Sequence, residues 1–372
     1  MNLYRHPGAW HGLIADNRGL WPNVKRLDEG TLGVFVYNRP SHGHDGGDVE
    51  MHVSRDGGRT WSFGAQVSEH AGHPEHVRMN HAVAADGHGR VVALVSGYSA
   101  DRRPPHPPCP PFLPVQYCLS EDAGRTWTRR FVTGDGAADI IPFGDAWLDE
   151  NGDCTAAFYA KEDPADCLRL GRMHTFVGRL DADGCMTGRS PLASDSAEAT
   201  LLRRQNGDWL AVGRDTSARA KPATLTATTD CLALWRREAG TGEWEHGGVL
   251  TLPGQVPAGL AETDDGAILM VYGSRIVGLC GILATLSEDG GRHWAPPVPL
   301  VSFTGPSDCG YPSLARVDAE TWLAVWYAGP PPDQFPPLTG IPDHPSYHTA
   351  GCLFPLSLVK PKKPENSAGH DV

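Results

Sequence analysis

A polar turn followed by a short apolar run recurs six times along this chain of 372 residues. Five of the turns carry a glycine and the last carries Glu320, and successive turns lie 54 to 63 residues apart. The runs are short, rich in Val, Leu, Ala and aromatic residues, and bounded by turn formers, a pattern that predicts strands rather than helices. The six copies lie at 28–38, 86–98, 149–160, 204–215, 263–275 and 317–328.

A second apolar segment precedes each turn and a third follows several of them, so each repeat has room for about four short strands. Six such units closed into a ring predict an all-β fold, a six-bladed β-propeller of four-stranded antiparallel blades. The 44 glycines and 32 prolines of the chain suit many turns and few long helices. A β-sandwich or a β-helix is the alternative, but six copies of regular length favour the propeller. A ring cannot be divided, so we expect one domain over residues 1–359 and a disordered tail over 360–372.

Three segments repeat one turn signature, Ser-x-Asp-x-Gly followed three residues later by Trp. They read SRDGGRTW at 54–61, SEDAGRTW at 120–127 and SEDGGRHW at 287–294. Ser and Asp side chains can bond the backbone NH groups of a tight turn, glycine accepts the left-handed backbone, and Trp can pack on the sheet. We therefore expect Asp56, Asp122 and Asp289 to serve folding and not chemistry.

These Asp-box (BNR) repeats, in phase with six blades, resemble the sialidase (neuraminidase) superfamily over about residues 18–330. The resemblance implies an exo-acting glycoside hydrolase that releases an acidic sugar, sialic acid or a related nonulosonic acid. It also implies a retaining mechanism with a tyrosine nucleophile, because a carboxylate would repel a sugar that carries its own carboxylate.

The resemblance assigns three catalytic residues. Asp48 lies six residues before the first Asp-box serine, the spacing of the family's acid/base. Tyr311, in DCGYPSLARV, matches the nucleophile, and Glu198 matches the carboxylate that polarises it.

Arginines of the family hold the sugar carboxylate, since guanidinium groups bind carboxylates through paired, charge-assisted bonds. Arg214 and Arg275 match two members of the family's arginine triad. The first member belongs to an Arg-Ile-Pro motif, and this chain has Leu-Trp-Pro-Asn at 20–23 in its place. The basic residues considered as substitutes are Arg18, Lys25, Arg39 and Arg78.

Further polar residues on the same predicted rim lie outside the family pattern. The loop RPSHGHDGGD at 39–48 brings His42, His44 and Asp45 beside Arg39. The start of the second repeat, VRMNHA at 77–82, adds three more candidate substrate-binding residues, namely Arg78, Asn80 and His81.

The formal charge of −12 argues against a nucleic-acid partner, which needs a basic face. No apolar run reaches the length of a membrane span, so we expect no membrane partner, and a carbohydrate as the only ligand. The nine cysteines form no CxxC pair and the histidines lack zinc spacing, so neither a metal nor a cofactor is predicted. The N-terminus shows no signal pattern, which favours the cytoplasm, or secretion if a leader was removed. The oligomeric state is left open.

Two other functions stay open. The first is a different enzyme on the same scaffold, either a glycosidase for another sugar or a uronic-acid lyase with His42 or His81 as base and Tyr311 as acid. The second is a sugar-binding propeller without catalysis.

Overall fold

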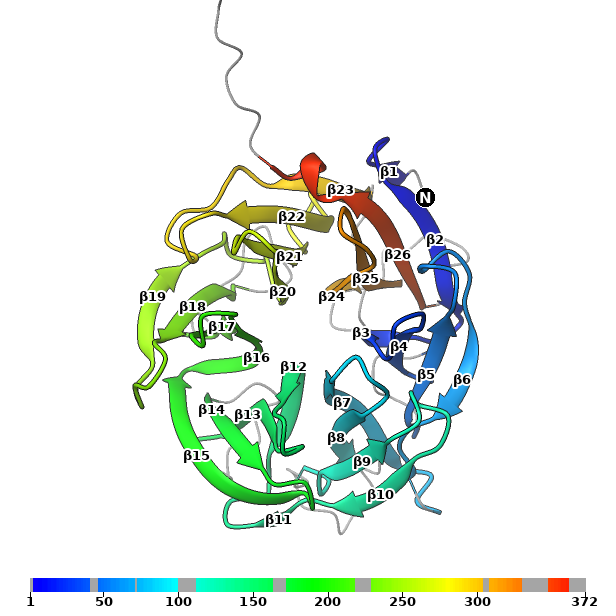
Figure 1. Ribbon diagram of the computed structural model, residues 1–372, viewed down its shortest axis with the longest axis vertical. Helices are drawn as coiled ribbons and strands as arrows, with labels where there is room; N and C mark the ends of the chain where they lie inside the picture. The colour runs from blue at the N-terminus through cyan, green and yellow to red at the C-terminus, as the bar shows by residue number, and fades with distance from the viewer. Residues whose placement is uncertain are drawn as a thin grey trace, which may run out of the picture.

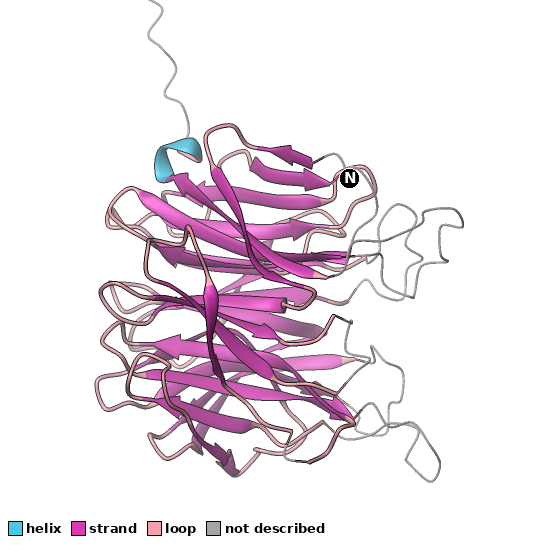
Figure 2. Cartoon of the chain, turned by 90° about the vertical axis from the view of Figure 1, so that its right-hand side faces the viewer, coloured by secondary structure: helices cyan, strands magenta, loops and turns pink. Residues whose placement is uncertain are grey.

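The computed structural model describes residues 3–40, 46–70, 72–99, 112–162, 172–217, 229–303, 308–329 and 347–360. Within these ranges the chain is almost entirely β-strand, and its one helix is the 3-10 turn η1 (Leu356–Leu358). The sheets stand in a ring around a common axis (Figure 1), and their strands run between the two faces of the ring (Figure 2). None of the described helical structure is long or apolar enough to cross a membrane. The predicted all-β propeller is therefore confirmed.

Three sheets have four strands each. The first is formed by β3 (Leu20–Arg26), β4 (Leu32–Tyr37), β5 (Val49–Ser54) and β6 (Ser62–Gln66). The second is formed by β16 (Ser196–Arg203), β17 (Trp209–Asp215), β18 (Cys231–Arg237) and β19 (Glu245–Val249). The third joins β24 (Asp308–Arg316), β25 (Thr321–Gly329) and β26 (His348–Pro355) to the N-terminal strand β2 (Trp10–Asp16), which closes the ring.

A fourth sheet has five strands, because the short N-terminal strand β1 (Leu3–Arg5) pairs with its outer edge. Its other members are β20 (Ala258–Glu262), β21 (Ile268–Ser274), β22 (Gly281–Ser287) and β23 (Val298–Phe303).

The fifth sheet has nine strands and spans two of the predicted repeats. One half is β7 (His76–Ala85), β8 (Val91–Ser99), β9 (Gln116–Ser120) and β10 (Thr128–Phe131). The other half is β12 (Ile141–Leu148), β13 (Cys154–Lys161), β14 (Met173–Leu180) and β15 (Cys185–Ser194), edged by β11 (Thr133–Gly134).

The prediction of six separate four-stranded blades is therefore not confirmed, since the strands in the described ranges join into five hydrogen-bonded sheets. The innermost strands converge on the axis, and there β7 and β12 pair in parallel at Ala82–Gly144 and Val83–Asp145. Gly144 has φ 78°, and a Cβ at this position would lie 2.9 Å from the backbone of Thr200 on β16. Only glycine allows the neighbouring strands to approach so closely.

Apolar side chains fill the spaces between neighbouring sheets. Between the first sheet and the nine-stranded sheet, Phe35 and Met51 pack in one cluster with Val83, Val91 and Val95. All five side chains are at most 1% exposed. Removing such buried volume costs about 2–5 kcal/mol for a large-to-Ala change, so these clusters hold the innermost strands in place.

The two ends of the ring differ, and strand register tells them apart. Leu20 on β3 pairs with Tyr37, which pairs with Val49 on β5, whereas Leu32 pairs with Ser54 at the opposite end. We call the end at which the innermost strands begin the start end. The Ser-x-Asp-x-Gly turns follow β5, β9 and β22, and therefore lie at the other end.

The three turns share the hydrogen bonds of the Ser hydroxyl with Asp and Gly, whereas the bond from a Trp indole to the Gly carbonyl is found in the first two turns and not at Trp294. In the first, the Ser54 hydroxyl donates to Asp56 at 2.8 Å and accepts from the Gly58 N–H at 2.9 Å. Asp56 also accepts from the backbone of Thr60 at 2.9 Å, and the Trp61 indole donates to the Gly58 carbonyl at 3.0 Å. Ser120 and Ser287 make the equivalent bonds to Gly124 and Gly291, each at 2.8 Å. The turns thus satisfy their own backbone groups.

Replacing Asp56 with Asn should lower the melting temperature at neutral pH and leave kcat within a few-fold. Hydrogen bonds from Thr60 lower the pKa of Asp56 from 3.8 to about 2, so its charged form stabilises the folded state. That contribution is present above pH 3.8 and is lost as the pH falls toward 2. Calorimetry from pH 7 downward should show the gap in melting temperature closing in this window. A large fall in kcat with unchanged melting would contradict a folding role.

Candidate active site

The site is built on irregular strand starts. Register shifts interrupt the pairing between Leu20 and Asn23, between Ala197 and Thr200, and between Gly310 and Ser313. Within these three bulges lie Trp21, Glu198 and Tyr311, with φ of 53°, 49° and 51°. Residues other than glycine seldom adopt positive φ, because this backbone conformation costs about 1–3 kcal/mol per residue. Residues held in such conformations are concentrated at functional sites. At each bulge the regular alternation of side chains along the strand is interrupted, so these three side chains point in a direction that a regular strand would not give them.

Tyr311 and Glu198 come together as predicted. The Tyr311 hydroxyl donates to Glu198 Oε1 at 2.6 Å. The two residues belong to different sheets and are 113 residues apart in the sequence. Burial, and next the negative charge of Glu198, raise the pKa of Tyr311 above its ordinary value. The phenol is therefore protonated at neutral pH, and Glu198 is the group placed to accept its proton.

Arg214 completes this chain of contacts. Its Nη1 donates to Glu198 Oε2 at 2.8 Å, and its Nε donates to Asp230. Burial disfavours the arginine charge, but Glu198 and Asp230 outweigh that effect and raise the pKa of Arg214. Arg214 thus holds Glu198 in position as well as contributing positive charge.

Arg275 approaches Tyr311 from the other side. Its guanidinium carbon lies 5.4 Å from the centre of the Tyr311 ring, within the range of a cation–π contact. Its nitrogens donate to the Cys309 carbonyl at 2.9 Å and to the Tyr327 hydroxyl at 3.1 Å. The fully buried Asp308 lies 3.5 Å away and accepts hydrogen bonds from Tyr327 and Tyr347. The charge of Arg275 is therefore balanced within the protein.

Trp21 lies in the segment 20–23, which stands where the family pattern has its Arg-Ile-Pro motif. Its indole lies edge-on to Tyr311, with ring centres 6.0 Å apart, and packs on Tyr37 and Tyr327 at 5.9 Å each. Phe143 also contacts Tyr311, with ring centres 5.6 Å apart. The proposed nucleophile thus lies between aromatic walls.

The four basic residues considered as substitutes each have another partner. Arg18 pairs with Glu50 at 3.2 Å, and Lys25 pairs with Asp145. Arg39 donates to the Gly46 carbonyl at 2.7 Å, and Arg78 to the Pro114 carbonyl at 3.0 Å. These hydrogen bonds hold Arg39 and Arg78 to backbone carbonyls and not to Tyr311 or Glu198.

Asp48 is in a separate group. Its carboxylate accepts from Ser68 at 3.1 Å and contacts His70 Nδ1. The side chain of Asp48 is 5% exposed and that of His70 is 32% exposed. His70, which sequence reasoning missed, is therefore the more accessible member of an Asp–His pair at the start end.

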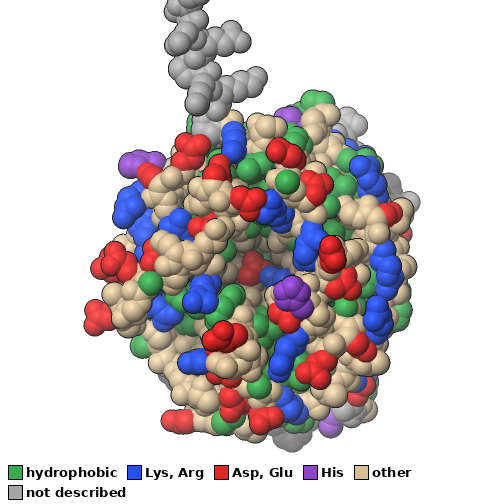
Figure 3. Space-filling view, viewed as in Figure 1, with side chains coloured by type: hydrophobic (Ala, Val, Ile, Leu, Met, Phe, Trp, Pro, Cys, Tyr) green, Lys and Arg blue, Asp and Glu red, His purple; other side chains and the backbone are tan. Residues whose placement is uncertain are grey.

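Asn80 and His81 border the axis of the ring, where a cavity of about 20 Å³ is lined from all six innermost strands. Asn80 donates to the Tyr159 hydroxyl at 3.4 Å. His81 Nδ1 faces the Met79 carbonyl at 3.0 Å, and burial lowers the pKa of His81 to about 4. His81 is thus a neutral, buried residue. From the other end, the molecule is hollowed on this axis, with side chains of both charges around the hollow (Figure 3).

His42, with His44 and Asp45, lies outside the described residues. The residues that sequence reasoning missed are partners across strands, namely His70, Tyr159, Asp230, Asp308 and Tyr327. Their signal in the sequence was weak, since each is a common residue without a motif.

Comparisons with known proteins show the fold. No protein-family model matches the chain, and no curated protein matches it. Among solved structures, a protein of unknown function from Dyadobacter fermentans is similar, with a TM-score of 0.71 and 18% identity over 94% of this chain and 99% of the other. A Hadza microbial sialidase has a TM-score of 0.68 and 16% identity, over 93% of this chain and 67% of the other. An α-L-arabinofuranosidase from Fusarium graminearum has a TM-score of 0.62 and 14% identity, over 95% and 99%.

The chain therefore has a sialidase-like propeller fold. The same fold carries enzymes named for different sugars, so the residues of the site must decide between substrates.

Proposed function

We propose that the protein is a retaining glycoside hydrolase with Tyr311 as nucleophile and Glu198 as its base. The observation that carries the proposal is the 2.6 Å hydrogen bond between a buried phenol and a carboxylate. As the Tyr311 oxygen bonds to the anomeric carbon, its proton passes to Glu198 and the bond to the leaving group breaks. Water then cleaves the glycosyl–enzyme bond, and the phenol regains its proton.

The leaving oxygen must receive a proton, and we propose that Asp48 and His70 supply it together. Both oxygens of Asp48 have partners, and the carboxylate is nearly buried, whereas the imidazole of His70 is accessible. A carboxylate that holds one ring nitrogen of a histidine orients the other nitrogen for proton transfer.

Leaving groups of different basicity test this proton donor. Asp48→Asn and His70→Gln should each lower kcat/KM by about 10²-fold or more on a glycoside with an alkyl leaving group. The same variants should change kcat/KM little on a para-nitrophenyl glycoside, whose leaving group needs no proton, although kcat can still fall because the pair also takes the proton of the attacking water. Asp45→Asn is the matched comparison, because Asp45 is the neighbouring loop carboxylate. If Asp45→Asn alone shows the selective loss, the proton comes from Asp45 and not from the Asp48–His70 pair.

For the substrate we propose an acidic keto sugar such as a sialic acid, in line with a tyrosine nucleophile and two arginines beside it. The second candidate is a neutral sugar. It is favoured by the lack of an arginine in the segment 20–23, where Trp21 contacts Tyr311 instead, and by the internal partners of Arg214 and Arg275. Aromatic walls suit the apolar faces of either kind of sugar.

The two other readings have less support. A lyase with His81 as base would use a buried imidazole whose pKa is about 4, a weak base at neutral pH. A binding protein without catalysis would have no need of two strained residues that join a phenol to a carboxylate.

A screen of aryl glycosides tests the proposal, with sialosides, uronides, rhamnosides and arabinofuranosides as substrates. Release of the aryl group with retained configuration supports a hydrolase, and the sugar released decides between the two candidates. A product with a new double bond would instead establish a lyase, and binding without turnover would establish a lectin-like role.

A further inference from the structure

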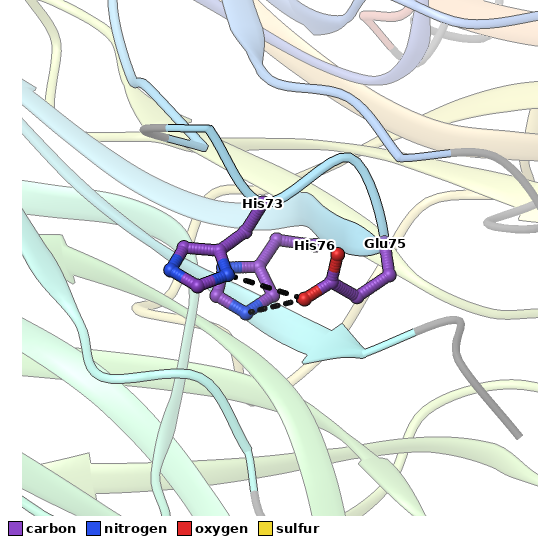
Figure 4. Close-up of side chains that lie close together, drawn as sticks. All are labelled: His73, Glu75 and His76. Carbon is purple, nitrogen blue, oxygen red and sulfur yellow. Dashed lines mark hydrogen bonds and ion pairs between the residues drawn. The ribbon is translucent and has the colours of Figure 1, made fainter. Parts of the chain in front are cut away.

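Two histidines and a glutamate meet in the turn that leads into β7, at the start end of the ring. His73 Nδ1 lies 3.2 Å from Glu75 Oε1, and His76 Nε2 lies 3.7 Å from the same oxygen. One donor atom from each of the three residues falls within 4.8 Å of the others. Figure 4 shows both imidazoles directed at this carboxylate oxygen.

The backbone holds this turn in shape. The N–H of His73 donates to the His70 carbonyl, and the N–H of His76 to the His73 carbonyl, both at 3.0 Å. The strand start beyond it is fixed by a bond from Gly47 N to the His76 carbonyl at 2.9 Å. A Cβ on Gly46 would collide with the carbonyl of Pro74, so the two segments are in close contact. The donor groups are therefore presented by an ordered turn.

The two imidazole rings are stacked, with centres 4.4 Å apart and planes at 15°. Stacking fixes the two rings relative to each other, so that one nitrogen of each lies near the same carboxylate oxygen. The side chains of His73, Glu75 and His76 are 60%, 32% and 20% exposed, which leaves the donors open to an ion from solvent.

The donor set selects the ion. Neutral imidazole is a ligand for zinc and similar divalent transition metals, while magnesium and calcium require oxygen ligands. Two histidines and one carboxylate, with a fourth position left for water, form an established type of zinc coordination. The present spacing of the donor atoms exceeds that of a loaded site, so small side-chain rotations would accompany binding.

We propose that His73, Glu75 and His76 bind one zinc-type divalent ion at the rim of the ring. The turn connects His70, the partner of Asp48, to β7, which carries Arg78, Asn80 and His81. A bound ion would therefore brace the edge of the candidate active site. The site is independent of the proposed hydrolase chemistry, which requires no metal.

Calorimetric titration of the full chain, without a histidine tag and freed of metal by chelator, tests the proposal. Titration with zinc chloride should show one zinc ion bound per chain. Magnesium chloride and calcium chloride should show no comparable binding. His73→Gln, Glu75→Gln and His76→Gln should each weaken this binding at least about tenfold. His88→Gln, at an exposed histidine in a different turn, should leave it unchanged.

A second measurement guards against misfolded variants. Zinc should raise the melting temperature of the wild type and of His88→Gln, because it binds only the folded turn. It should raise that of His76→Gln markedly less, while the metal-free melting temperatures of all three agree. Equal zinc affinity in the wild type and the three turn variants would overturn the proposal, as would equal weakening in His88→Gln.

Discussion

Tyr311→Phe should lower kcat by at least ~10³-fold, because it removes the oxygen that forms the glycosyl–enzyme bond. The aromatic ring keeps its contacts with Trp21 and Phe143, and Glu198 keeps its bond to Arg214. Substrate affinity should therefore change little, since the lost contribution belongs to the transition state and not to ground-state binding. Steady-state kinetics on the best aryl glycoside of the screen, with binding measured by calorimetry, separates the two effects.

The matched control is Tyr272→Phe, which removes a hydroxyl from another buried tyrosine in a different cluster. Its kcat should stay within a few-fold of the wild type. A fluorinated sugar of the correct type should label the wild-type protein on the peptide that contains Tyr311 and should not label the Phe variant. A label on another peptide, or normal turnover by the Phe variant, would exclude a tyrosine nucleophile and bring the lyase and binding functions forward.

The pairing of Tyr311 with Glu198 could be predicted from sequence because both residues open the first strand of a repeat. In a ring, equivalent strand positions converge at one end, so spacing along the chain becomes proximity at the axis. The geometry that aims the two side chains could not be predicted in this way. It depends on bulges and positive φ at Glu198 and Tyr311, where the wider structure overrides the preference of the residue.

Asp48 shows the opposite case. Its spacing from the first Asp-box serine placed it correctly at the start end, but nothing in that spacing indicated its burial. Ser68 and His70 follow the outermost strand of the same sheet and return to the start end, where they cover the carboxylate. A partner contributed by a neighbouring segment carries no signature in a single sequence, which is also why Asp230 and Asp308 were missed.

The segment 20–23 carries no arginine, so the charge around Tyr311 depends on the residues that contact it and on their partners. Among the described residues, the charged side chains linked to Tyr311 directly or through one partner are the cations Arg214 and Arg275 and the carboxylates Glu198, Asp230 and Asp308. Two cations against three carboxylates leave no surplus of positive charge in this group. A substrate carboxylate must therefore compete with internal partners for both arginines, and a developing positive charge at the anomeric carbon is favoured.

Arg214→Met should destabilise the fold by about 3–5 kcal/mol, because it removes the guanidinium that pairs with a buried carboxylate. The side chain of Asp230 is fully buried and that of Arg214 is 10% exposed, so solvent cannot replace the lost charge. The free energy of unfolding, measured by denaturant titration, should fall by this amount. Arg316→Met is the matched control, since the Arg316–Asp264 pair is 35% and 72% exposed and its loss should cost less than about 1 kcal/mol.

The double variant Arg214→Met/Asp230→Asn distinguishes a structural arginine from a purely substrate-binding one. Asn at position 230 removes the negative charge that Arg214 balanced, so the double variant should be more stable than Arg214→Met alone, with a coupling of about 1–3 kcal/mol. Activity should stay low in both variants, because Glu198 has lost the guanidinium that holds it toward Tyr311. If the two changes add without coupling and Arg214→Met unfolds like the wild type, the ion pair does not support the fold. The guanidinium would then serve the substrate alone, and a net cationic site for an acidic sugar would regain its support.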